Sequence, residues 1–337
     1  MRATWIEAPG QISVTEVPDP TIEKPTDAIV RVVAGCICGS DLWPYRGEND
    51  VTPGTIGHEC VGVIEEVGSE VRDFTTGDFV IVPFDHCDNT CAHCRAGMQS
   101  GCVNLGFTAS GQAEFSKVNF ADGSLVKTEG MPDGAMIPAL LTLSDVMATG
   151  WHAAVTAGVT KGSTAVVVGD GAVGLCGVLA ARTLGAERII ALSRHEPRQA
   201  VARQFGATDI VAERGKEATT AVMELTGGVG ADAVLECVGT NDSFRTAFRV
   251  ARPGATVGMV GVPHGVELPL QSMFGRNVAL AGGMAPVRKY LPELLDLVTS
   301  GEIDPSPVFD ATLPLADVAE GYRRMDQREA IKVLIQP

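Results

Sequence analysis

The chain has 337 residues, of which 45% are hydrophobic, and its formal net charge is −15. This length exceeds what one hydrophobic core serves, so we expect two domains. The acidic balance argues against a nucleic-acid partner, since a phosphate backbone requires a basic face. No apolar stretch approaches the roughly 20 residues that span a bilayer, and residues 1–14 contain no apolar signal core. We therefore expect a cytoplasmic protein with no membrane and no nucleic-acid partner.

Residues 1–145 are rich in glycine and proline, with short alternating apolar runs at 28–33 and 61–67. Such runs bounded by turn residues predict a compact, antiparallel, barrel-like β domain. The same region carries three side chains that zinc accepts in tetrahedral sites, at Cys38, His58 and Glu59. Each alone is more often structural, but together with a nucleotide domain they would form an open, catalytic zinc site. That site needs a further strong ligand, for which Asp145 is the candidate.

A second ligand group lies at about residues 85–103. Cys91, Cys94 and Cys102 follow the spacing C-x2-C-x7-C, in which the first two thiolates hold one ion within a turn. Without a secretory signal, this cluster favours a structural zinc over disulfides. The fourth ligand stays open between two neighbours. Asp88 repeats the two-residue step, whereas Cys87 offers the softer donor that zinc prefers.

The pattern changes at about residue 146, where strand and helix begin to alternate. A buried strand at 164–168 is followed by an apolar helix at 172–184 and a second strand at 188–192. This alternation predicts a parallel, doubly wound sheet. It continues through a helix at 197–205 and through apolar runs at 233–238 and 256–260.

The tail, from about residue 284, has a helix at 291–299, an amphipathic segment at 315–325 and a strand at 331–335. That strand can return to the first domain. The expected layout is therefore a β-rich domain from 1–145 with 284–337, split by a nucleotide domain at 146–283.

The glycine loop between strand 164–168 and its helix predicts the cofactor. Gly169, Gly171 and Gly174 form the pattern GxGxxG, with Ala172 and Val173 between them. Such glycines permit a tight turn and let the backbone approach a pyrophosphate at the helix N-terminus. Alone the pattern is weak, but its place between a buried strand and a helix indicates a dinucleotide.

The end of the second strand indicates which dinucleotide. A cofactor with a bare ribose 2′-hydroxyl would be met there by a carboxylate, but this chain has Ser193. Arg194 and Arg198 offer positive charge for a 2′-phosphate. NADP(H) is therefore expected over NAD(H). The alternative is a solvated basic patch without a ligand.

Taken together, these residues resemble the zinc-dependent alcohol dehydrogenases of the medium-chain dehydrogenase/reductase superfamily over essentially the whole chain. The resemblance implies a GroES-like catalytic domain divided by a Rossmann domain. The motifs that carry it are Gly35-Cys-Ile-Cys-Gly-Ser-Asp41, Gly57-His-Glu59, the cysteine group, the glycine loop and Ile331-Lys-Val333.

The resemblance also implies roles for single residues. Cys38, His58 and Asp145 would hold the catalytic zinc, with Glu59 as an exchangeable or supporting ligand. Ser40 would hand on the proton of an alcohol whose pKa the zinc lowers. The alcohol would then lose a hydride to the nicotinamide, and the reverse reaction would reduce a carbonyl.

Further positions follow from the same register. Trp43 and Phe84 would line the substrate pocket, and Lys332 would approach the cofactor pyrophosphate. Two positions depart from the family pattern. Trp43 stands where many members carry a histidine that relays the proton, and Asp88 stands where the first lobe cysteine is usual.

The expected function is hydride transfer between NADP(H) and a primary or secondary alcohol or its aldehyde or ketone. One catalytic and one structural zinc and a homodimer or homotetramer would accompany it. A polyol or sugar dehydrogenase on the same scaffold is the first alternative, and charged pocket residues would favour it. A non-catalytic NADPH-binding redox sensor is the alternative from another class, but it would not need Cys38, His58 and Asp145.

Overall fold

The computed structural model describes all 337 residues as two compact units. The split unit comprises Met1–Asp145 and Pro286–Pro337, and the inserted unit comprises Val146–Ala285. The second boundary thus lies at 285/286 rather than at the expected 283/284. None of the helices combines the length and the hydrophobicity that a membrane-spanning segment requires.

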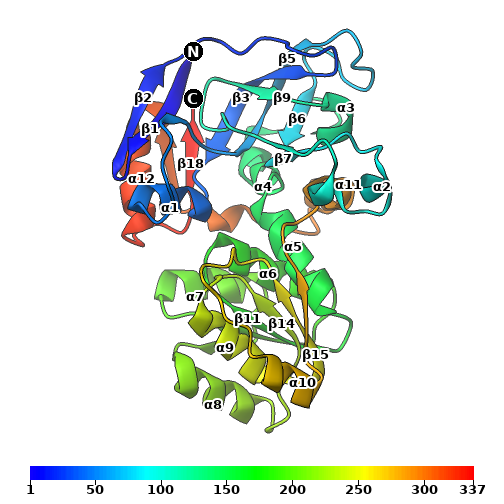
Figure 1. Cartoon of the computed structure of the whole chain (residues 1–337), viewed down its shortest axis with the longest axis vertical. Helices are drawn as coiled ribbons and strands as arrows, with labels where there is room; N and C mark the ends of the chain where they lie inside the picture. Colours follow the sequence, from blue (N-terminus) through cyan, green and yellow to red (C-terminus); the bar gives the residue numbers. More distant parts are fainter. The chain divides into compact units, whose positions relative to one another are not determined.

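A seven-stranded sheet forms the centre of the split unit, with the order β10-β6-β5-β3-β18-β17 and with β9 also paired to β3. Strand β18, from the C-terminal segment, runs antiparallel to β3 and pairs Leu334 with Cys36 (Figure 1). Chain segments on either side of the inserted unit therefore share one sheet. The strands are β3 (Ala28–Cys36), β5 (Glu59–Val67), β6 (Phe79–Val82), β9 (Phe115–Val118), β10 (Val126–Lys127), β17 (Ala311–Pro314) and β18 (Val333–Gln336).

The sequence of β3 explains its place in this sheet. Of its nine residues only Arg31 is exposed, and β-branched Val30 and Val32 pack against Ile64 and Val80 of the neighbouring strands. Branched side chains suit a pleated surface, and each one fully buried stabilises the fold by about 1.5–3 kcal/mol. This core holds the end of β3 and the start of β5, and the candidate ligands Cys38, His58 and Glu59 lie at these two places.

Smaller elements complete the split unit. A three-stranded sheet has the order β2-β1-β4, and short helices connect or cover the strands. These elements are β1 (Arg2–Ala8), β2 (Gln11–Glu16), β4 (Gly54–Thr55), β7 (Asp85–His86), β8 (Gly106–Phe107), η1 (Gly39–Asp41), α1 (Leu42–Arg46), α2 (Ala92–Arg95), η2 (Gln99–Gly101), α3 (Ala121–Ser124), η3 (Gly134–Met136), α4 (Ile137–Thr142), α11 (Val287–Thr299), η4 (Ser306–Val308), η5 (Leu315–Asp317) and α12 (Val318–Asp326).

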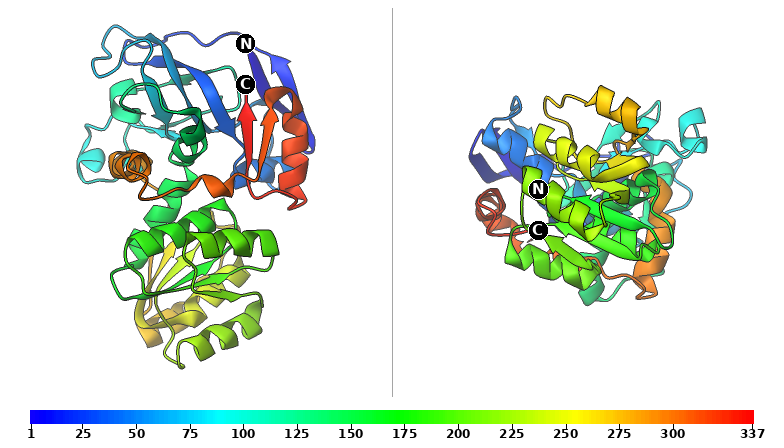
Figure 2. Two further views of the ribbon diagram at one scale, coloured as in Figure 1. Left: turned by 180° about the vertical axis from the view of Figure 1, so that it is seen from behind. Right: turned by 90° about the horizontal axis from the view of Figure 1, so that it is seen from below.

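The inserted unit is a six-stranded sheet in the order β13-β12-β11-β14-β15-β16, and all its pairings are parallel. Helices lie on both faces of this sheet (Figure 2). Its strands are β11 (Thr164–Val168), β12 (Arg188–Leu192), β13 (Asp209–Val211), β14 (Ala231–Glu236), β15 (Ala251–Met259) and β16 (Ala279–Gly282). Its helices are α5 (Val146–Ala157), α6 (Ala172–Thr183), α7 (Glu196–Phe205), α8 (Gly215–Leu225), α9 (Asn241–Val250) and α10 (Leu270–Arg276).

The register of the inserted sheet defines its ligand-binding edge. Val168, at the end of β11, lies opposite Leu192 on one side and Glu236 on the other. The chain order runs outward in opposite directions from β11 and β14, and ligands of doubly wound sheets bind at such a reversal, beyond the carboxyl ends of the strands. The glycine loop begins at this place, directly after Val168.

Candidate active site

Four side chains that the sequence singled out converge in the split unit. The ligand atoms of Cys38, His58, Glu59 and Asp145 all lie within 4.8 Å of one another. Asp145 Oδ2 lies 3.5 Å from Cys38 Sγ and 3.4 Å from His58 Nε2. A thiol, an imidazole and carboxylates at this spacing form a donor set that fits a zinc ion.

Asp41 orients two of these ligands. Its Oδ2 accepts a hydrogen bond from the backbone N–H of Cys38 at 2.9 Å, which caps helix η1. Its Oδ1 lies 3.4 Å from His58 Nδ1, so the other ring nitrogen is directed at Asp145. Sequence reasoning missed this role. An acid three residues after an N-cap position is the pattern of a capping box and could have revealed the first contact.

Gln112 supports Asp41 from the opposite side and is fully buried. Its Nε2 donates to Asp41 Oδ2 at 3.0 Å, and its Oε1 accepts from Tyr322 Oη at 3.2 Å. A Cβ at Gly57 would stand 2.4 Å from the Gln112 side chain. Gly57, the residue before His58, is therefore required to be glycine by this packing, and its φ of +98° also favours glycine.

Glu59 has a buried cationic partner. Its Oε1 lies 2.7 Å from Lys332 Nζ, which also donates to the carbonyl of Ile37 at 3.2 Å. Glu59 Oε2 is buried without a hydrogen-bond partner, so this donor set includes a carboxylate oxygen that a metal ion would satisfy. The structure thus places the Lys332 ammonium on Glu59, and its approach to the cofactor pyrophosphate stays a prediction.

Of the two residues named for the substrate pocket, Phe84 lies beside this set. The Phe84 ring stands edge-on to the His58 ring, with 6.2 Å between centroids. The backbone N–H of Phe84 donates to the carbonyl of Ser144 at 3.0 Å, which holds the segment beside Asp145. Ser40 in η1 and Trp43 in α1 are half-buried. No structural observation tests their roles in proton transfer and substrate binding.

Asp85, directly after Phe84, is a polar residue that sequence reasoning missed. It is 2% exposed, and neither of its carboxylate oxygens has a hydrogen-bond partner. Burial raises the pKa of Asp85 to about 7, and the charge of Asp145 adds to this rise. The place of Asp85 soon after the fully buried strand β6 is a feature of the sequence that could have indicated a buried acid.

The second metal-ligand set lies in the lobe around α2. Cys91 Sγ lies 3.5 Å from Cys94 Sγ and 3.9 Å from Cys102 Sγ. Of the two candidates for the fourth position, only Asp88 belongs to the set whose ligand atoms lie within 4.8 Å of one another. Cys87 instead directs its thiol to the carbonyl of Gly123 at 3.3 Å. Cys87 is therefore excluded from this set by its side-chain direction.

Asp88 reaches the lobe because it also stabilises the local turn. Its Oδ1 accepts from the backbone N–H groups of Thr90 at 2.8 Å and Cys91 at 2.9 Å. An Asp side chain forms such a turn readily, whereas a thiol accepts hydrogen bonds weakly. These backbone bonds lower the pKa of Asp88 against the effect of burial, so the residue is a carboxylate at neutral pH.

The glycine loop of the inserted unit fits a pyrophosphate. Gly169 has a φ of +118°, and a Cβ at Gly174 would lie 2.0 Å from the Gly169 carbonyl oxygen, so both positions require glycine. A Cβ at Gly171 would meet no protein atom within 4 Å. The first and third glycines thus serve the turn, and the second keeps open the space that a phosphate needs at the N-terminus of α6, where Ala172 and Val173 follow.

The residues named for the adenosine ribose lie beside this loop. Ser193 is buried at the end of β12, and Arg194 is exposed. Arg198, expected to be available to a 2′-phosphate, is instead paired with an acid of the glycine loop, because its Nη1 lies 3.5 Å from Asp170 Oδ1. Sequence reasoning missed Asp170, since it lies at a variable position of the glycine pattern.

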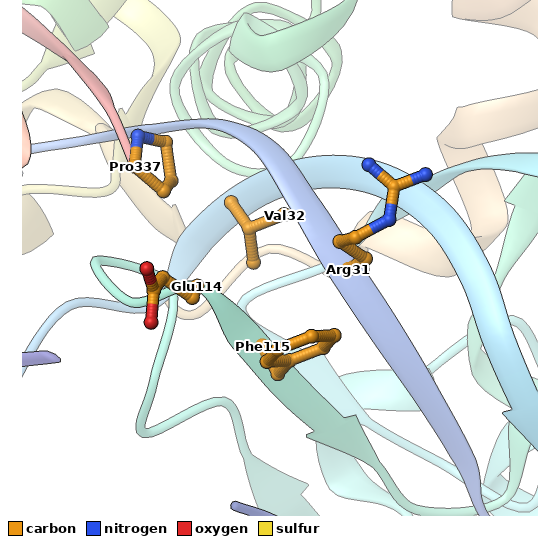
Figure 3. A pocket seen from close by; sticks show the side chains of 5 residues that line it. All are labelled: Arg31, Val32, Glu114, Phe115 and Pro337. Atoms are coloured by element: carbon orange, nitrogen blue, oxygen red, sulfur yellow. The ribbon is translucent and has the colours of Figure 1, made fainter. Parts of the chain in front are cut away.

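Two surface pockets lie apart from these sites. One, of about 310 Å³, is lined by five residues of the split unit and shares none with either ligand set (Figure 3). The other, of about 500 Å³, includes Thr164 and Arg188 at the amino ends of β11 and β12. That end of the sheet is opposite the glycine loop. Neither pocket contains a residue of the two candidate metal-ligand sets.

Comparisons with known proteins define the class of the chain. Residues 24–132 match the family model of the alcohol dehydrogenase GroES-like domain, and residues 172–300 match that of zinc-binding dehydrogenases. The chain therefore belongs to the zinc-dependent alcohol dehydrogenases of the medium-chain dehydrogenase/reductase superfamily. The GroES-like match lies within the split unit, and the inserted unit has the parallel, doubly wound sheet of a Rossmann domain.

Individual relatives agree over the whole chain. The probable zinc-binding alcohol dehydrogenase Rv1895 of Mycobacterium tuberculosis is 36% identical over 100% of this chain and 89% of its own length. The NADP-dependent isopropanol dehydrogenase of Thermoanaerobacter brockii is 35% identical over 90% of this chain and 87% of its own. The solved alcohol dehydrogenase TADH from Thermus sp. ATN1 superimposes with a TM-score of 0.91 at 32% identity, covering 100% and 99% of the two chains.

Proposed function

We propose that this oxidoreductase transfers a hydride between NADP(H) and a primary or secondary alcohol or the corresponding aldehyde or ketone. The observation that carries the proposal is the convergence of Cys38, His58 and Asp145 around Glu59, whose second carboxylate oxygen is buried without a partner. A redox sensor without catalytic activity would have no use for this set.

Cys38, His58 and Asp145 would hold the catalytic zinc, and Glu59 would support it or exchange with a ligand. Bound there, zinc supplies Lewis acidity that makes an alcohol hydroxyl more acidic and a carbonyl more electrophilic. The lobe formed by Asp88 and its three cysteines would hold a second, structural zinc. Membership of a zinc-dependent family and the two donor sets support this assignment.

Side chains of the protein orient the metal ligands, accept the substrate proton and position the substrate. Asp41 fixes the ring of His58 through Nδ1, so that Nε2 points inward. Ser40 accepts the proton of the substrate hydroxyl. Because Trp43 replaces the usual relay histidine, the proton leaves Ser40 by another route. Phe84 and Trp43 exclude water and hold the apolar part of the substrate, which brings the reacting carbon to a near-attack position.

We further propose a preference for NADP(H). Ser193 removes the carboxylate that would repel a 2′-phosphate, and the exposed Arg194 can pair with that phosphate. Arg198, held by Asp170, contributes less. The name of the isopropanol dehydrogenase relative, which states that it is NADP-dependent, supports the same preference.

The test is a panel of primary and secondary alcohols and their carbonyls, assayed with NADP(H) and NAD(H). We expect turnover with higher kcat/KM for the phosphorylated cofactor. Cys38→Ser and His58→Ala should abolish turnover and retain cofactor binding, whereas His93→Ala, which removes an exposed imidazole, should change neither. Cofactor binding without turnover on any member of the panel would contradict the proposal and support the sensor.

Metal content and assembly are checked on the same preparation. We expect about two zinc ions per chain and about one in Cys38→Ser, because each donor set holds one ion. Full activity with a single zinc would remove the catalytic-zinc assignment. The expected homodimer or homotetramer is checked by light scattering.

A polyol dehydrogenase is the second candidate, and Asp85 is the observation that favours it. A second hydroxyl of the substrate would donate to this buried, unpartnered carboxylate. If so, Asp85→Ala lowers kcat/KM for propane-1,2-diol far more than for propan-2-ol. An equal effect on both alcohols would exclude Asp85 from substrate recognition.

A further inference from the structure

Asp170 forms a hydrogen-bonded group with two residues at the ribose edge of the inserted sheet. Its Oδ2 accepts from Ser193 Oγ at 2.9 Å, and its Oδ1 lies 3.5 Å from Arg198 Nη1. The same guanidinium nitrogen donates to the Asp170 backbone carbonyl at 3.1 Å. The Asp170 and Arg198 side chains are only 20% and 13% exposed, so the group is ordered rather than freely solvated.

The Asp170 carboxylate lies close to the place where a doubly wound fold usually carries an acidic residue for the ribose. In a doubly wound fold, the 2′-hydroxyl of a bare ribose is bound by an acid at the end of the second strand. Here that position is Ser193, but its hydroxyl donates to Asp170. The Asp170 carboxylate therefore lies within hydrogen-bond distance of Ser193, the residue at which a carboxylate is usual.

We propose that Asp170 supplies, from the glycine loop, the carboxylate that the end of β12 lacks, and that it limits the preference for NADP(H). This proposal rests on the cofactor assignment above and concerns the same site. Asp170 is a specificity-determining residue that binds the 2′-hydroxyl of NAD(H) and opposes the 2′-phosphate of NADP(H).

The charges around the ribose explain both effects. A carboxylate accepts a hydrogen bond from a hydroxyl but repels a phosphate, which carries no hydrogen to donate when fully ionised. Asp170 also occupies the guanidinium of Arg198, which would otherwise pair with the phosphate. Of these two arginines, Arg194 can attract the phosphate without competition from Asp170. Removing the charge at position 170 therefore frees the Arg198 guanidinium for the phosphate and removes the repelling carboxylate.

The experiment measures binding rather than turnover. Asp170→Asn keeps the size and the hydrogen bond from Ser193 but removes the charge. Dissociation constants of NADPH, NADH, 2′,5′-ADP and 5′-AMP are measured by calorimetry for parent and variant. A hydrogen bond or ion pair with a charged group changes a dissociation constant by a factor of at least about ten. We therefore expect the dissociation constant of NADH, divided by that of NADPH, to rise about tenfold or more in the variant. The ratio of 5′-AMP to 2′,5′-ADP constants should rise likewise.

Glu187→Gln is the matched control, since it removes one exposed negative charge just before the amino end of β12 and should leave both ratios unchanged. Asp170→Ser provides a second variant, and thermal unfolding verifies that each variant is folded. Unchanged ratios in both folded variants overturn the proposal, as does an equal change for all four ligands. A parent that prefers NADH, combined with the expected rise in the variants, contradicts the NADP(H) preference but supports the role of Asp170.

Discussion

Lys332 and Glu59 carry opposite charges with 1% and 0% of their side chains exposed. Breaking such a buried pair leaves a charge without compensation, which costs about 3–5 kcal/mol. We predict that Lys332→Met lowers the free energy of unfolding by about this amount, because Glu59 already has one oxygen without a partner. Urea unfolding of parent and variant at neutral pH measures the loss.

The control for this prediction is an ion pair on the surface. Arg323 bonds Glu320 at 2.7 Å, but its side chain is 40% exposed. Arg323→Met should therefore change stability far less than Lys332→Met, because water replaces the lost partner. The double variant Glu59→Gln/Lys332→Met should recover part of the loss. Equal effects of the two single variants would show that Glu59 does not need a buried cation.

The same residues show what the sequence could predict. The residue types and motifs of Cys38 and His58 predict that they share a site, and the family resemblance adds Asp145; the structure brings the three side chains together. Their supports were not found, because contacts between distant positions leave no local pattern. Lys332 lies 273 residues from Glu59, and Gln112 lies 71 residues from Asp41. Asp88 was favoured over Cys87 by local spacing, which is the kind of information that a sequence contains.

At the scale of elements, alternation of strands and helices predicted the inserted sheet closely. The strand expected at 188–192 is β12, and the helix expected at 172–184 is α6 with one residue fewer. The tail was less accurate. Helix α11 begins at Val287 rather than at 291, and Pro292 lies inside it. Strand β18 begins at Val333 rather than at 331, because the backbone N–H groups of Ile331 and Lys332 donate to the Asp310 carboxylate.

The end of β14 makes a prediction about pH. Glu236 is fully buried, its Oε1 accepts from the N–H groups of Val238 and Gly239, and its Oε2 has no partner. Burial raises the pKa of Glu236 above its ordinary value of 4.5. As pH rises above that value, the unfolded chain loses this proton while the folded chain retains it. The contribution of Glu236 to stability is therefore full at low pH and is lost as pH rises through the raised pKa.

Glu236→Gln stays neutral at every pH and keeps an acceptor for both N–H groups. We predict that the stability of this variant, relative to the parent, increases as the pH is raised from 4.5 into the alkaline range, until the buried carboxyl of the parent ionises. Chemical unfolding across this range measures the difference. Glu224→Gln, at an exposed position of α8, should follow the parent at each pH. A constant difference between Glu236→Gln and the parent would show that Glu236 is ionised throughout.

At the scale of the whole molecule, the two units differ in how the chain builds them. The inserted unit is one continuous segment with its own core, whereas the split unit needs two segments. We predict that residues 146–285 expressed alone unfold cooperatively and bind NADPH. Residues 1–145 alone should not fold, because β3 lacks β18 and Glu59 lacks Lys332. Calorimetric unfolding and cofactor titration of the two fragments measure both outcomes.

Addition of residues 286–337 to the 1–145 fragment provides the control. It should restore folding and zinc binding, since it supplies β17, β18 and the buried lysine. A stably folded 1–145 fragment without this addition would show that the antiparallel strands of the N-terminal segment suffice. An unfolded 146–285 fragment would show that the inserted unit depends on its neighbour.

The pairing of β3 with β18 also has a consequence during translation. A ribosome that adds about 5–20 residues per second reaches Lys332 roughly 10 to 40 s after it has added Asp145. Throughout this interval the nascent GroES-like segment exposes an open strand edge and an uncompensated carboxylate, while the Rossmann segment emerges complete. The domain that begins first on the ribosome is thus the one that matures last. Its early strands are therefore open to wrong pairing until the C-terminal segment has been made.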